Sequence, residues 1–178
     1  MQRNLQFFAL SLTLLLTATA AQSQIENIPK SWDIPEEPKW QEAEIKLPEF
    51  PKPENLVPFD VLPTTGTRYL IDASTLNVGK DGIVRYVLVI KASGGATNIT
   101  YEGMRCNTVE YKLYATGRAN GTWAIAKTRS DEWRPIQNKA NSHHMAINKD
   151  YFCPKSDAIA NADEGRDALR RGRNPRAE

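Results

Sequence analysis

Histidine and cysteine are scarce in this chain of 178 residues, which contains two of each. The two histidines are adjacent, and neither a Cys-x-x-Cys nor a His-x-x-x-His spacing occurs, so no recognisable metal-ligand pattern is present. No glycine-rich stretch has the phosphate-loop pattern, and a formal net charge of +2 creates no strong field that would attract nucleic acid. We therefore expect no metal, no cofactor and no nucleic-acid partner.

Long apolar runs are also missing, except at the N-terminus. There, Arg3 precedes an apolar run, and small residues follow at 18–21. The run has roughly a dozen residues, whereas a helix that spans a membrane needs about 20. This order is typical of a secretory signal peptide, which we place at residues 1–21, with an uncleaved anchor as the alternative. After cleavage we expect no transmembrane segment.

Proline is concentrated in one segment, because eight of the eleven prolines lie between Pro29 and Pro63. Such a density opposes regular helices and central strands, so residues 22–63 are predicted to form an extended arm. The arm has four lysines and nine acidic residues, whereas residues 64–155 have thirteen Lys or Arg and seven acidic residues. The opposite charges favour packing of the arm on its own domain. Binding of its proline-rich stretches to a partner's aromatic groove is the alternative.

Residues 64–155 alternate strand-forming runs with turn residues at a spacing of about ten. An Asp-Gly turn precedes the run IVRYVLVIK, for example, and Arg118-Ala119-Asn120-Gly121 separates two later runs. No helix alternates with these strands, so an antiparallel meander is predicted rather than a parallel sheet. In VEYKLYA, the period of two places Val109, Tyr111, Leu113 and Ala115 on one face of a strand.

One face of such a sheet needs a cover, and the C-terminal part of the chain can supply it. The segment SHHMAINKDYFC is predicted to form a short helix, and a second helix is expected after a cap at Ser156 or Asp157. The predicted fold class is therefore α+β: an antiparallel meander with one or two short C-terminal helices and an extended N-terminal arm. Residues 156–178 are expected to be a charged tail, helical or disordered.

Cys106 and Cys153 allow two interpretations. A thiolate at Cys106 next to Arg105 would be a nucleophile if a histidine served as its base. In an exported chain, however, two cysteines favour a disulfide, which would close a loop of about 47 residues and contribute roughly 4 kcal/mol. We favour the disulfide and expect a domain stapled by it over residues 64–155.

The candidate functional residues are Glu102, Arg105, His143 and His144. Glu102 and a histidine are of the types that serve as general acid and base. Acidic residues on strands more often lie in ion pairs on the solvent face, where they contribute little, and Glu102 and Arg105 are expected there. Adjacent histidines on a helix diverge by about 100°, which disfavours a shared metal ion. Gly103 between the two charges indicates a bulge or a close approach.

Six short motifs resemble the cryptic neisserial protein family, small exported proteins of Gram-negative bacteria. They are ENLVPF (54–59), YLID (69–72), VGKDGIVRY (78–86), YEGMRC (101–106), WRPI (133–136) and DYFC (150–153). The resemblance implies a location in the cell envelope and a paired cysteine, but no catalytic residue. The order of elements is also similar to surface-adhesin E domains, which implies an antiparallel sheet, a packed helix and a binding role.

These observations predict an exported envelope protein, periplasmic or associated with the outer membrane, that acts as a non-enzymatic binding or structural module. The expected partner is an envelope protein or polymer. A small envelope enzyme that uses Glu102 with His143 or His144 is one alternative, and a surface adhesin-like binding domain is another. No oligomeric state is predicted.

Overall fold

Turn residues divide the central part of the chain into consecutive strands. The computed structural model describes residues 39–62, 66–127, 132–139 and 142–177, so the expected signal peptide and the first part of the arm lie outside the described residues. The strands are β1 (Leu56–Phe59), β2 (Arg68–Val78), β3 (Val84–Lys91), β4 (Thr97–Arg105), β5 (Glu110–Gly117), β6 (Trp123–Ile125) and β7 (Arg134–Pro135). Among these residues no helix is long and apolar enough to span a bilayer.

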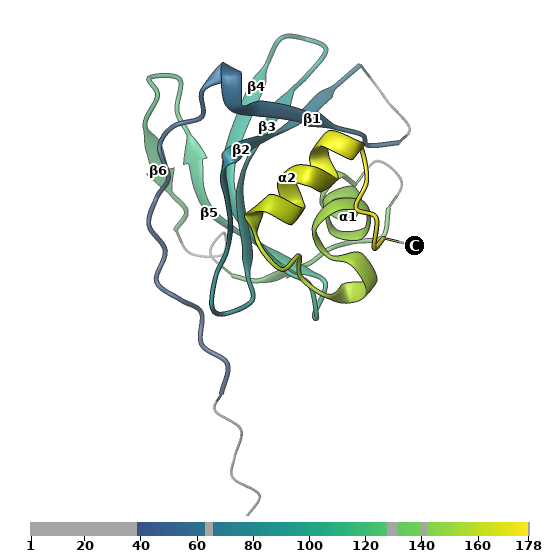
Figure 1. Ribbon diagram of the computed structural model, residues 1–178. Coiled ribbons are helices and arrows are strands. Elements are labelled where there is room, and N and C mark those ends of the chain that lie inside the picture. The colour runs from purple at the N-terminus through teal and green to yellow at the C-terminus, as the bar shows by residue number, and fades with distance from the viewer. Residues whose placement is uncertain (1–38, 63–65, 128–131, 140–141, 178) are drawn as a thin grey trace, which may run out of the picture. The chain divides into compact units, whose positions relative to one another are not determined.

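The strands form one antiparallel sheet in the order β1-β2-β3-β4-β5-β6, and β7 pairs with the other end of β5 (Figure 1). Each neighbour in this order is also the next strand in the chain, so the predicted meander is confirmed. Asp81-Gly82 forms the β2–β3 turn, in which Gly82 has φ +76°, a conformation that suits glycine. The register then follows from the turns: Lys91 lies opposite Thr97, and Tyr86 opposite Glu102.

Short helices cover one face of the sheet. They are α1 (His143–Ala146), the π-helical η3 (Ile147–Phe152) that continues it, the 3₁₀ turn η4 (Pro154–Ser156) and α2 (Ala162–Arg171); another 3₁₀ turn, η1 (Pro53–Asn55), precedes β1. Phe152 and Ile159 are almost fully buried against Tyr86 and Leu88 of the sheet. The predicted cover by two short helices is therefore confirmed, and Figure 1 shows α1 and α2 on the same side of the strands.

The cap of the second helix differs from the prediction. The N-cap is Asn161, whose side chain accepts a hydrogen bond from the backbone of Glu164, rather than Ser156 or Asp157. The helix starts later because residues 154–160 form η4 and an extended link. It is amphipathic and packed: Ala168 and Leu169 are buried, and Gly165 lies against Leu76, where a larger residue would clash.

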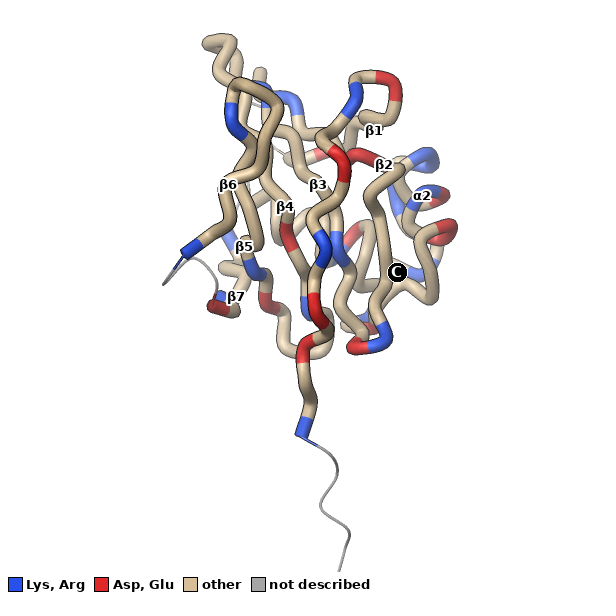
Figure 2. The backbone as a smooth tube through the Cα atoms, turned by 90° about the vertical axis from the view of Figure 1, so that its left-hand side faces the viewer, with Lys and Arg blue, Asp and Glu red and all other residues tan. Residues whose placement is uncertain are grey.

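The opposite face of the sheet is covered by the chain segment before β1, residues 40–52, which has no regular secondary structure. Glu42 accepts hydrogen bonds from Lys112 Nζ (2.8 Å) and Tyr114 Oη (2.7 Å), and Trp123 Nε1 donates to the carbonyl of Pro48 (3.0 Å). Figure 2 looks onto this face and shows the segment crossing the strands before it enters β1. This part of the arm therefore packs on its own domain, and an acidic arm residue pairs with a basic strand residue.

A β-bulge in β5 changes which residues share a face. Tyr101 pairs with Ala115 and Glu102 with Leu113, so Tyr114 is the extra residue between them. As a result Tyr111 packs with the core under the helices, whereas Ala115 packs with the core under the arm segment. The prediction that Tyr111 and Ala115 share a face is therefore wrong, because a strict period of two does not continue through a bulge.

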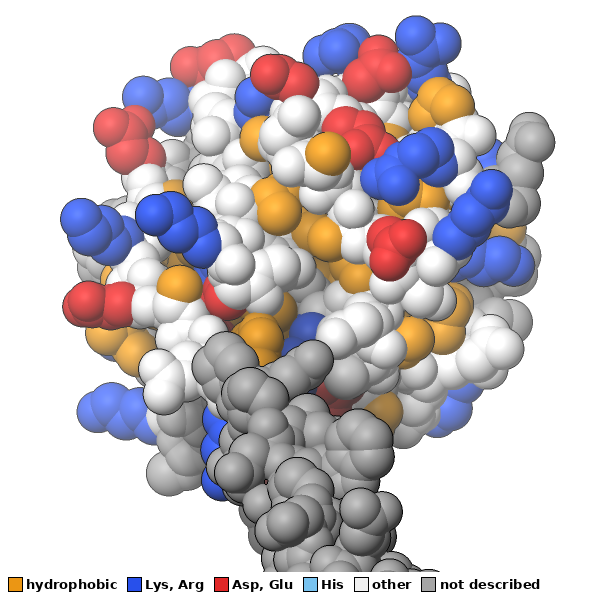
Figure 3. Space-filling view, turned by 60° about the horizontal axis from the view of Figure 1, so that its bottom comes forward, with side chains coloured by type: hydrophobic (Ala, Val, Ile, Leu, Met, Phe, Trp, Pro, Cys, Tyr) orange, Lys and Arg blue, Asp and Glu red, His pale blue; other side chains and the backbone are white. Residues whose placement is uncertain are grey.

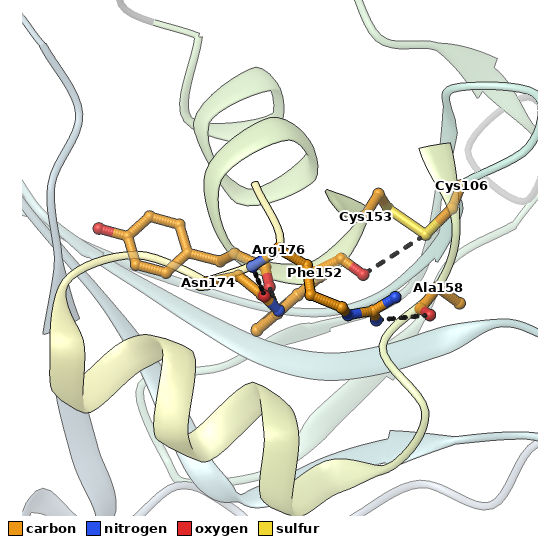
Figure 4. The surroundings of a disulfide bond; sticks show 7 residues. Cys106, Phe152, Cys153, Ala158, Asn174 and Arg176 are labelled. Atoms are coloured by element: carbon orange, nitrogen blue, oxygen red, sulfur yellow. Dashed lines mark hydrogen bonds between the residues drawn. A yellow bond between two sulfur atoms is a disulfide. The ribbon is translucent and has the colours of Figure 1, made fainter. Parts of the chain in front are cut away.

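A disulfide joins the end of β4 to the end of η3. Cys106 and Cys153 are bonded with their Cα atoms 5.2 Å apart, and both are almost completely buried. Figure 4 shows Cys106 Sγ beside the carbonyl of Phe152, at 3.6 Å, and the C-terminal residues Asn174 and Arg176 nearby. The expected staple between sheet and helix is therefore present, and it holds the segment that begins with α1 against the strands.

Candidate functional site

Glu102 lies on the helix-covered face of β4 and has only 4% of its surface exposed. The expectation that it marks the solvent face is wrong. Alternation along β4 puts residues 102 and 104 on one face and residues 101, 103 and 105 on the other, and the helices cover the face of Glu102. The carboxylate of Glu102 is therefore buried in a largely apolar core.

Three side chains satisfy this carboxylate. Its Oε1 accepts a hydrogen bond from Thr100 Oγ1 (2.8 Å), and its Oε2 lies 3.2 Å from Tyr86 Oη and 2.8 Å from His144 Nε2. Burial would raise the pKa of Glu102, but the hydrogen bond and charge of His144 and the bond from Thr100 outweigh it, and the pKa is lowered below 4.5. Burial and the charge of Glu102 raise the pKa of Tyr86 well above 10, so Tyr86 stays a donor.

The two histidines start α1 directly after its N-cap, Ser142, which accepts a hydrogen bond from Met145 N (3.2 Å). The His144 ring stacks on Tyr111 at 3.7 Å between centroids, and the His143 ring on Tyr69 at 5.5 Å. The two imidazoles lie 4.1 Å apart. Because adjacent helical residues diverge, the two rings stack on different tyrosines, and His144 also contacts the carboxylate of Glu102.

Burial and, to a smaller extent, the charge of His144 lower the pKa of His143 from 6.5 to about 4, although Glu102 opposes both effects. His143 is therefore neutral at pH 7. His144 makes the direct bond to Glu102, with 14% of its side chain exposed. Of the two histidines, His144 is thus the one whose ring is held in place by a direct bond to the carboxylate.

An open cleft of about 580 Å³ lies on the outer side of these rings. We call it the α1 cleft; it is lined by Tyr111, Arg134, Pro135, Ile136, Gln137, Lys139, Ser142, His143 and His144. The volume falls within the range of roughly 300–1,000 Å³ that is usual for small-molecule sites. The cleft combines an aromatic wall with basic and amide side chains, and Glu102 lies behind His144.

Arg105 does not belong to this site, although the sequence places it three residues from Glu102. It lies on the arm-covered side, where its guanidinium stacks over the Trp40 ring at 3.7 Å and pairs with Glu110 at 3.2 Å. The structure thus brings together Glu102, His143 and His144 and separates Arg105 from them. Gly103 has the expected close approach: a Cβ there would come within 2.8 Å of the Tyr114 ring.

Several residues of the site were not predicted from the sequence. Tyr86 could have been found by counting back from the Ser93-Gly94-Gly95 turn, because a tight hairpin there pairs residue 86 with residue 102. Arg134 and Lys139 had no such signal, since only the folded chain brings β7 and the following loop next to α1. Within the described residues, no group of three or more His, Cys, Asp or Glu side chains is placed to hold a metal ion.

Comparison with known proteins gives one match. The model of the CNP1-like family matches residues 35–170, which is more than half of the chain and includes every residue of the site. Neither the curated proteins nor the solved structures yielded a match.

Proposed function

The chain belongs to the CNP1-like family, and from that premise we propose that it is an exported protein of the bacterial envelope that acts as a non-enzymatic binding module, with the α1 cleft as its ligand site. Two features support export. Residues 1–21 have the order of a signal peptide, and a buried disulfide suits an oxidising compartment.

The observation that carries the binding role is the buried pair of Glu102 and His144 at the floor of the cleft. A buried ion pair is usually no better for stability than apolar residues of similar size. The pair instead fixes the orientation of His144, because Glu102 binds Nε2 and Tyr111 stacks on the ring. A polar group that is held rigidly at the wall of an open cleft suits recognition of a ligand.

Photocrosslinking in cells tests this proposal. A photoreactive amino acid at Gln137, in the cleft, is compared with one at Asn120, in the exposed β5–β6 turn. We expect a defined adduct from Gln137, none from Asn120, and loss of the Gln137 adduct when His144→Asn is added to a chain that still folds. Identical adducts from both positions, or none from Gln137, would count against a ligand site in the cleft.

A small envelope enzyme is the second candidate, and the same pair favours it. A carboxylate bonded to a histidine that reaches a cleft is an arrangement that serves general acid–base catalysis. In that case His144 would move the proton and Glu102 would orient it. Turnover that is lost in His144→Asn would support the enzyme, whereas ligand release without chemical change supports the binding module.

The third candidate is a surface adhesin-like domain. It rests on the order of Ile-Asp before a hairpin, a mid-domain cysteine, Trp-x-x-Ile and a terminal cysteine, which is similar to surface-adhesin E domains, and on the likeness to exported neisserial proteins. The antiparallel sheet with packed helices suits this candidate. Adhesion of cells or beads that carry the chain, compared with His144→Asn, separates it from a periplasmic role.

A further inference from the structure

The charged side chains among the described residues that line the α1 cleft all have one sign. Arg134 and Lys139 are the positive residues, His143 and His144 add two imidazole rings, and none of the described residues that line the cleft is acidic. The chain as a whole is nearly balanced, with 23 basic and 21 acidic residues, and basic and acidic groups are interspersed on the face drawn in Figure 3. A purely basic lining is therefore a local feature of this cleft.

A neighbouring cleft provides a comparison within the same molecule. This second cleft, of about 420 Å³, shares Lys139 and Ser142 with the first but also contains Asp60 and Asp150 beside Lys149. Its two acidic residues offset two of its three basic ones, and Asp150 lies 3.9 Å from Arg173 Nε. A position next to α1 is therefore not enough to make a cleft basic. Of the two clefts, the one with the basic lining is the one that His143 and His144 face.

The acidic side chain of Glu102, which lies behind His144, is turned inward. Both carboxylate oxygens of Glu102 are occupied by Thr100, Tyr86 and His144, and its side chain is 5% exposed. With Nε2 bound to Glu102, Nδ1 is the nitrogen of His144 that can meet a ligand. An Nδ1–H group donates a hydrogen bond to an anion, and the contact between Nε2 and Glu102 holds the ring in position for it.

We propose, on the basis of the binding role inferred above, that the α1 cleft binds an anionic group, a carboxylate or a phosphate, on a ligand of the size of a sugar or short peptide. Arg134 and Lys139 attract the anion, and His144 fixes its position. The aromatic ring of Tyr111 and the amide of Gln137 contact the neutral part of the ligand. The charged and titratable neighbours of His144 are Glu102 behind it and His143 beside it, and Arg134 and Lys139 line the same cleft.

Titration of the mature protein with three sugars tests the proposal, followed by amide chemical shifts in NMR. Glucuronate presents a carboxylate, glucose 6-phosphate a phosphate, and glucose is the neutral match. We expect shifts at residues 134–144 with at least one of the two acids and none with glucose. Which acid binds more tightly identifies the anion as carboxylate or phosphate.

Charge variants provide the second arm of the experiment. Lys139→Gln should weaken binding of the acid about tenfold, the loss expected for one hydrogen bond to a charged group. Lys149→Gln, in the second cleft, removes the same charge nearby and should leave the affinity unchanged. Lys139 is exposed, so its variant is expected to fold, whereas His144→Asn needs a check of its unfolding curve first.

The outcomes separate this inference from the binding role. Glucose that binds the cleft as well as the acids do, or an equal loss in Lys139→Gln and Lys149→Gln, overturns the anion site and leaves the binding module standing. No shift with either acid up to about 20 mM, well beyond the millimolar range of weak ligands, also overturns the anion site. A crosslink from Gln137 in cells would then still support a ligand of other chemistry.

Discussion

His143 makes the stability of this protein depend on pH in a defined window. The folded protein holds the pKa of His143 at about 4, whereas the ordinary value of 6.5 applies to the unfolded chain. Between these values the unfolded chain binds a proton that the folded chain does not, so stability falls as the pH falls from 6.5 towards 4. Integration gives a loss of about 2.5 kcal/mol at pH 4.5 relative to pH 7.5.

Replacement of His143 with phenylalanine should remove this dependence. A phenyl ring keeps the stacking on Tyr69 and the contact with His144 but takes up no proton. Urea unfolding at several pH values between 4.5 and 7.5 measures the effect. The difference in unfolding free energy between His143→Phe and the original chain should grow by about 2.5 kcal/mol in favour of the variant on going from pH 7.5 to pH 4.5.

Because His143→Phe and the original chain share the other titrating groups, the contributions of these groups to the pH dependence cancel in the comparison. The pKa of Glu102 is lowered below 4.5, so the stability that its ionised form contributes is lost only as the pH falls through its folded-state value, below the window of the assay. Parallel pH profiles of the variant and the original chain would refute the argument. An NMR titration in which the His143 ring of the folded protein becomes protonated near pH 6.5 would refute it as well.

Three further substitutions test the interactions that stabilise the structure around the site. Cys106→Ser with Cys153→Ser opens the loop of 47 residues and should cost about 4 kcal/mol in urea unfolding, whereas a cost below about 1 kcal/mol would contradict a stapling role. Asp81→Asn leaves Arg85 buried beside a neutral amide; the side chains of Asp81 and Arg85 are 2% and 6% exposed, so we expect a loss of about 3–5 kcal/mol. About 2.4 kcal/mol of this difference should disappear as the pH falls from 3.8 towards 2, because Asp81 itself, with a pKa of about 2, becomes protonated. Gly103→Ala forces a methyl group against a tyrosine ring and should cost about 1–3 kcal/mol; an unchanged midpoint would show that the ring moves aside freely.

The candidate site was only partly predictable, and Glu102 shows why. Its residue type and the presence of two histidines in the chain suggested acid–base chemistry, but its environment was predicted incorrectly. Glutamate on a strand is usually exposed, and nothing within ten residues of position 102 indicates burial. The partner that buries it, His144, comes 42 residues later and arrives only when α1 docks on the sheet.

The bulge in β5 is a second feature that could not be predicted from the sequence. The period of two assigned Tyr111, Leu113 and Ala115 to one face of the strand, and this assignment is correct as far as Leu113. The insertion of Tyr114 depends on the space that Gly103 leaves in the neighbouring strand, where the Tyr114 ring lies over the glycine. Such a fit between two strands is not visible in either strand alone.

By itself, the sequence determined the meander, the two helical segments and the pairing of the cysteines, because turns, periodicity and a single cysteine pair are local or countable features. The tertiary structure decided where the carboxylate lies, which histidine bonds to it and that the cleft beside α1 has a basic lining. The physical reason is that burial, hydrogen bonding and local charge depend on distances between residues that are far apart in the chain, and folding alone sets those distances.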